Sequence, residues 1–113
     1  MSDDDSQIVI PPAFIALFVA PGRIKPTESR AFIAERHEFC EDLASTLTET
    51  AQQQLWSLGV TEADVLERIH RGLSQTVGGQ AAVSAAEARW VTGRLAELLG
   101  WESALPQDPA PPG

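Results

Sequence analysis

Hydrophobic positions recur at helical spacing in three segments of this chain, and each segment is bounded by residues that start or stop helices. Ser84 stands three residues before Glu87, where its hydroxyl can accept from the Glu87 amide and the Glu87 carboxylate can reach back to the Ser84 amide. Thr61 precedes Asp64 in a shorter version of the same capping box. Glycines follow the segments as candidate stops, at Gly59, Gly78, Gly79 and Gly100.

The first helix is expected to begin near Thr27 or Ser29 and to run to Leu58, a long amphipathic element. Acidic residues gather on its polar face, at Glu35, Glu38, Asp42 and Glu49. The apolar stripe comprises Phe32, Ile33, Cys40, Leu43, Ala44, Leu47, Ala51 and Leu58.

The second helix is expected from Glu62 to about Val77, with Val65, Leu66, Ile69, Leu73 and Val77 facing inward. Gly72 falls on that face, and glycine costs about 1 kcal/mol in a helix relative to alanine, so we expect another helix to approach closely there.

The third helix is expected from Ala85 to Leu99, followed by Trp101 as a hydrophobic lock beyond Gly100. Its expected buried residues are Ala88, Val91, Leu95, Leu98 and Leu99.

The apolar segment between Pro11 and Gly22 fits either a short helix or a buried strand, and proline at a first turn favours the helix. The pattern therefore predicts an all-α fold, a small antiparallel bundle of three main helices with this segment docked on it. Docking within one chain is expected, and exchange into a second copy would give a homodimer.

Polar and proline-rich compositions mark the two ends. We expect residues 1–7 to form a disordered acidic N-terminus, residues 8–101 the helical domain, and residues 102–113 a proline-rich disordered tail.

A net charge of −8 with Lys25 as the single lysine argues against nucleic-acid and anionic membrane partners. The apolar stretch from Ile8 to Ala20 is too short to span a bilayer and is broken by prolines. With Cys40 as the single cysteine, no intramolecular disulfide can form, which favours a cytoplasmic location.

Metal-ligand residue types crowd together at His37, Cys40 and Glu41, which raises the alternative of a metal-binding or redox module. Cys40 lies on the apolar stripe, so a buried thiol beside an acidic face is the favoured interpretation, and no metal or cofactor is expected. Glu67 and His70 show the Glu-x-x-His spacing of di-iron bundles in one copy, so a surface pair is expected. A phosphate-binding Walker loop needs a lysine before Ser or Thr, whereas Lys25 precedes proline.

Four residues are candidates for contact with a protein partner. Arg36 and Arg94 lie on or near apolar stripes, where each can either pack its stem or receive a partner's carboxylate. Trp56 falls on the polar side of the long helix and Trp90 at the edge of its stripe, so at least one indole is expected to be partly exposed.

Three stretches resemble small proteobacterial proteins that often carry the label "ATPase with chaperone activity". They are Pro11 to Phe18, Pro21-Gly22-Arg23, and His37 to Ala44. The resemblance would cover roughly residues 11–101 and implies a bacterial, chaperone-associated setting, with nucleotide hydrolysis as a further alternative that the missing Walker loop disfavours. The residues themselves predict a non-enzymatic helical adaptor or regulatory module that binds another protein.

Overall fold

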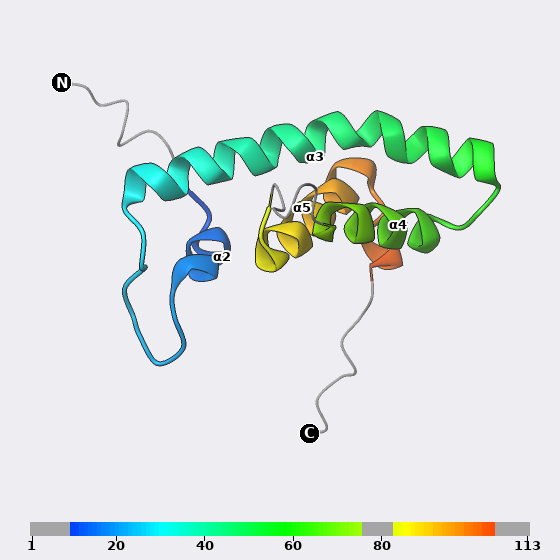
Figure 1. Cartoon of the computed structure of the whole chain (residues 1–113). Coiled ribbons are helices and arrows are strands. Elements are labelled where there is room, and N and C mark those ends of the chain that lie inside the picture. The colour runs from blue at the N-terminus through cyan, green and yellow to red at the C-terminus, as the bar shows by residue number, and fades with distance from the viewer. Residues whose placement is uncertain (1–9, 76–82, 106–113) are drawn as a thin grey trace.

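The computed structural model describes residues 10–75 and 83–105, and in this part of the chain the fold is all-α (Figure 1). The long helix α3 (Arg30–Leu58) lies across the molecule, and α4 (Glu62–Ser74) runs back along its C-terminal half. The third main helix, α5 (Ala85–Leu99), packs against both α3 and α4. Close to the N-terminal half of α3 lies α2 (Pro12–Ile15), which continues into the 3-10 helix η1 (Ala16–Phe18). The predicted three-helix bundle is confirmed.

The long helix begins and ends where the sequence predicts. The Ser29 hydroxyl accepts from the Phe32 amide, and Gly59 ends the helix at φ 62°, a left-handed conformation that favours glycine. Its ends are less covered than expected, because Phe32 is 40% and Leu58 49% exposed. The helix has 29 residues, against 15 in α5, so both of its ends extend past the helix that covers its middle.

The expectation of a close helix approach at Gly72 is wrong. Gly72 is exposed in the last turn of α4, and a Cβ built there would meet no atom within 4 Å. The helix ends at Ser74, earlier than predicted, while Val65, Leu66 and Ile69 form its buried face. The predicted inward residue Val77, like Gly78 and Gly79, lies outside the described residues.

Helix α5 has the predicted bounds and the full capping box between Ser84 and Glu87. Beyond its end, the Trp101 amide donates to the Ala96 carbonyl over 2.8 Å and the Trp101 side chain is buried, which confirms the hydrophobic lock. Leu98 was expected to be buried but is 43% exposed. It lies in the last turn, where the chain folds back and the Trp101 side chain enters the core instead.

The N-terminal apolar segment docks within the same chain, as predicted. Helix α2 is only one turn long, but its residue Phe14 is fully buried and belongs to the core. A loop follows, and it is closed by an isolated antiparallel bridge between Val19 and Pro26. Both the amide and the hydroxyl of Thr27 donate to the Phe18 carbonyl.

The packed part of the chain continues beyond Trp101, the expected end of the helical domain. Residues Glu102–Ala104 form the 3-10 helix η2, and Ala104 and Leu105 pack against the core. Residues 1–7 and 106–113, expected to be disordered, lie outside the described part of the chain.

Candidate protein-binding site

One of the candidate residues, Arg36, joins α3 to α5 in an ion pair with Glu87. Its Nε and Nη2 each donate to a Glu87 carboxylate oxygen over 2.8 Å, a two-point geometry that is stronger than a single contact. The same carboxylate accepts from the Ser84 amide over 2.9 Å, so one buried side chain both caps α5 and ties it to α3. The Arg36 guanidinium also lies 4.9 Å from the centre of the Phe39 ring.

The environment of this pair keeps Glu87 charged. Burial by itself would raise the pKa of the Glu87 carboxyl, but the hydrogen bonds from Arg36 and Ser84 outweigh burial and hold this pKa below its usual value. The Glu87 carboxylate in turn raises the pKa of Arg36. Of the two roles that its place on the apolar stripe allowed, Arg36 therefore has the intramolecular one.

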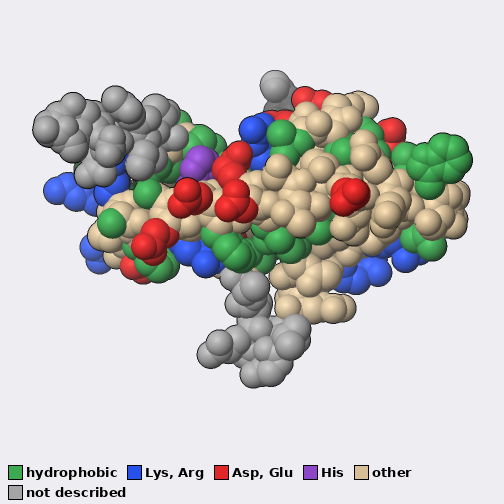
Figure 2. Space-filling model, turned by 90° about the horizontal axis from the view of Figure 1, so that it is seen from above, with side chains coloured by type: hydrophobic (Ala, Val, Ile, Leu, Met, Phe, Trp, Pro, Cys, Tyr) green, Lys and Arg blue, Asp and Glu red, His purple; other side chains and the backbone are tan. Residues whose placement is uncertain are grey.

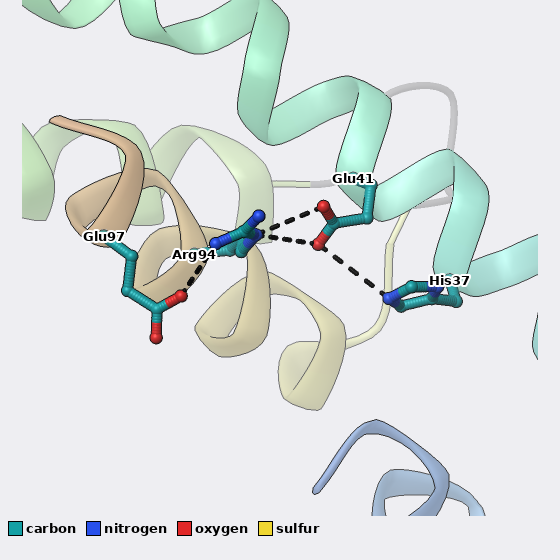
Figure 3. A network of polar contacts seen from close by, with 4 residues as sticks. All are labelled: His37, Glu41, Arg94 and Glu97. Carbon is teal, nitrogen blue, oxygen red and sulfur yellow. Dashed lines mark hydrogen bonds and ion pairs between the residues drawn. The ribbon is translucent and has the colours of Figure 1, made fainter. Parts of the chain in front are cut away.

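The second candidate arginine, Arg94, lies in a network of charged side chains between α3 and α5 (Figure 3). Its Nε donates to both Glu41 oxygens over 3.0 and 3.1 Å, and its Nη1 donates to Glu97 over 2.9 Å. The His37 Nε2 lies 3.8 Å from the Glu41 carboxylate, at the other side of that group. Both arginines are thus matched with carboxylates across the same helix pair.

Trp90 packs in an aromatic cluster with Phe14 and His37, which the sequence did not predict. The Phe14 ring meets the Trp90 ring edge to face at 5.0 Å and the His37 ring at 5.2 Å, while His37 and Trp90 are 5.4 Å apart. The two contacts of the fully buried Phe14 fix α2 on the bundle, while the contact between His37 and Trp90 joins α3 to α5. The hydrophobic run around Phe14 was the available sequence signal, but its partners are remote in sequence.

Trp56 differs from the other three candidates because its side chain is largely in solvent. It is 87% exposed at the C-terminal end of α3, so the predicted exposed indole is found. The indole borders an open hollow of about 810 Å³ whose other lining residues are mainly polar. These residues are Glu49, Gln52, Gln53, Leu55, Ser57 and Trp101. Tryptophan is among the residue types enriched in the hot spots of protein interfaces.

Of the three residues of the metal or redox alternative, His37 and Glu41 lie side by side, but Cys40 does not complete a ligand set with them. Within residues 10–75 and 83–105, no group of three His, Cys, Asp or Glu side chains could hold a metal ion. Cys40 is fully buried, and burial raises the pKa of its thiol to about 11, far from the range of a reactive thiolate. Glu67 is exposed and pairs with Arg71 over 3.1 Å, in agreement with a surface role.

In comparisons with known proteins, no protein-family model, curated protein or solved structure matches the chain. None of the helices in the described part of the chain is long and apolar enough to cross a membrane.

Proposed function

We propose that this protein is a non-enzymatic helical interaction module and that the C-terminal end of α3, around Trp56, is its contact surface. One observation carries the proposal: the large Trp56 indole is 87% exposed on a well-capped helix, and tryptophan is among the residue types enriched in the hot spots of protein interfaces. Leu58, 49% exposed two residues further on, adds apolar surface to the same end of α3.

The engagement of the other candidates supports this choice. Arg36 and Arg94 are paired with carboxylates, and Trp90 is covered by Phe14, so each already has an intramolecular partner. Trp56 has no ring contact among the described residues and remains available to another molecule. The resemblance to small proteobacterial proteins supports a bacterial, chaperone-associated setting for this contact, and the single cysteine supports a cytosolic one.

The test compares Trp56→Ala with Ile24→Ala, because Ile24 is also an exposed hydrophobic residue, at 91%, but lies in the loop before α3. Immobilised wild-type protein should retain a partner from native lysate, the Trp56 variant should lose it and the Ile24 variant should keep it. Far-UV circular dichroism should be unchanged in both variants, because neither side chain is packed in the core. Equal retention by the wild type and Trp56→Ala would overturn the proposal.

A further inference from the structure

The hollow beside Trp56 is lined by groups suited to a positively charged side chain. Among its lining residues Glu49 supplies a carboxylate and Gln52 and Gln53 supply amide oxygens, whereas none is Lys or Arg. An exposed indole attracts a cation over its face, at about 0.5–1 kcal/mol in an exposed site. The aromatic face, the carboxylate and the amide oxygens therefore all favour a positively charged ligand.

The same chemistry continues along the outer face of α3. Asp42, Glu49 and Trp56 follow one another at seven-residue intervals, which is two helical turns or about 10 Å per step. Glu35 and Glu38 extend this exposed face by two more acidic residues toward the N-terminal end of the helix. Figure 2 looks onto this side of the molecule and shows acidic side chains spread along α3, with hydrophobic side chains at the right-hand end where the helix finishes.

These acidic side chains lack the pairing seen between α3 and α5. None of the ion pairs among the described residues includes Glu35, Glu38, Asp42 or Glu49. By contrast Glu41 of α3 is matched with Arg94 of α5, and Glu87 of α5 is matched with Arg36 of α3. The charged side chains between α3 and α5 thus form ion pairs within the fold. The four carboxylates on the outer face of α3 form none with the described residues.

We infer that the occupant of this face is a basic segment of another protein, with an arginine or lysine over the Trp56 indole and further basic residues along Glu49 and Asp42. This inference rests on the proposed function and adds the chemistry of the partner. A second copy of the chain is a poor occupant, because two copies joined through this face would bring like charges together in a chain whose net charge is −8. Nucleic acid is disfavoured for the same reason.

The inference can be tested with a designed peptide before any natural partner is known. The probe is an 18-residue helical peptide with arginines along one face, and its control carries glutamate at those positions. Binding is followed by calorimetry and by the NMR signal of the Trp56 indole N–H, assigned by its loss in Trp56→Ala. The arginine peptide should shift this signal and the glutamate peptide should leave it in place.

Two double variants test whether binding depends on where the acidic residues lie or only on the net charge of the protein. Asp42→Asn/Glu49→Gln removes two charges from the outer face of α3, whereas Glu28→Gln/Glu102→Gln removes two exposed charges elsewhere. We expect at least a tenfold loss of affinity in the first variant and less than a threefold loss in the second. Raising the salt concentration from 50 to 300 mM should weaken wild-type binding severalfold, because exposed charges are screened.

The outcomes distinguish the two levels of the proposal. If Trp56→Ala abolishes partner retention but the arginine peptide fails to bind, or binds both double variants equally, the contact surface stands and the basic partner is refuted. If Trp56→Ala changes neither retention nor peptide binding, both proposals fail. If Trp56-dependent dimerisation appears in sedimentation, a second copy is the occupant and the basic partner is again refuted.

Discussion

Glu87→Gln should be the most informative test of how this bundle is held together. Glu87 is 4% exposed, and its carboxylate accepts two hydrogen bonds of 2.8 Å from Arg36 and one of 2.9 Å from the Ser84 amide. Glutamine keeps nearly the same shape and one acceptor oxygen, so the change removes the charge and one hydrogen-bond acceptor without creating a cavity. The guanidinium of Arg36 is then left half-buried without its counterion.

The magnitude follows from the geometry. Removing one partner of a fully buried ion pair costs about 3–5 kcal/mol, but the Arg36 side chain is 25% exposed, so solvent recovers part of this cost. A hydrogen bond to a charged group contributes about 1.5–3 kcal/mol. The side-chain oxygen of the introduced glutamine can still accept from the Ser84 amide, so the cap of α5 is retained. We therefore expect a loss of about 2–3 kcal/mol, which for a domain of this size lowers Tm by about 10–20 °C.

Urea unfolding followed by circular dichroism at pH 7 measures this loss, with Glu97→Gln as the matched control. Glu97 also accepts from an arginine, over 2.9 Å, but its side chain is 56% exposed, so its removal should cost less than about 0.5 kcal/mol. Equal losses in the two variants would refute the structural role of the Arg36 pair.

The pH dependence gives a second test of the same reasoning. The pKa of Glu87 is lower in the folded protein than in the unfolded chain, where it is about 4.3, so the folded state binds fewer protons in this range. The contribution of Glu87 is therefore fully present above about pH 4.3 and is lost as the pH falls through the folded pKa. The stability difference between wild type and Glu87→Gln should shrink on acidification, and a constant difference down to pH 2 would contradict this account.

Three further predictions concern packing and the thiol. Gly72→Ala should raise the unfolding free energy by about 0.5–1 kcal/mol, because a methyl group meets no neighbour there and alanine is the better helix former; a lower Tm would show that the site is not open. Phe14→Ala should cost about 3–5 kcal/mol and increase dye binding, because the ring that joins α2 to His37 and Trp90 is lost; an unchanged urea midpoint would mean that α2 does not contribute to the core. Cys40 is fully buried and has a pKa of about 11, so its thiol should not react with iodoacetamide in the native protein at pH 8. Labelling should increase with added urea in parallel with unfolding, and rapid labelling of the native protein would disprove the burial of Cys40.

The helix boundaries were the part most open to sequence reasoning, because capping is a local interaction. Ser29, Thr61 and Ser84 each accept from the amide three residues on, and Gly59 and Gly100 take left-handed conformations. Such contacts involve neighbours along the chain, so their residue types and spacing are sufficient to predict them. The exposure of Trp56 also followed from its angle on the polar side of α3.

The burial of residues near helix ends could not be predicted from local sequence. A helical angle says which face a residue occupies but not whether another helix reaches that far, which is why Phe32, Leu58 and Leu98 are more exposed than expected. The interpretation of Gly72 failed for this reason too, since a position in the last turn of α4 has no neighbour to approach it.

The chain by itself thus determined the helices, their order and the polar outer face of α3, since these depend on local capping and on helical period. Tertiary structure decided which polar groups are already matched. Arg36 lies 51 positions from Glu87 and Arg94 lies 53 from Glu41, and each pair meets because α3 and α5 pack against one another. No local pattern encodes such a meeting, so four equivalent candidates in the sequence became two internal ion pairs, one covered indole and one indole left in solvent at Trp56.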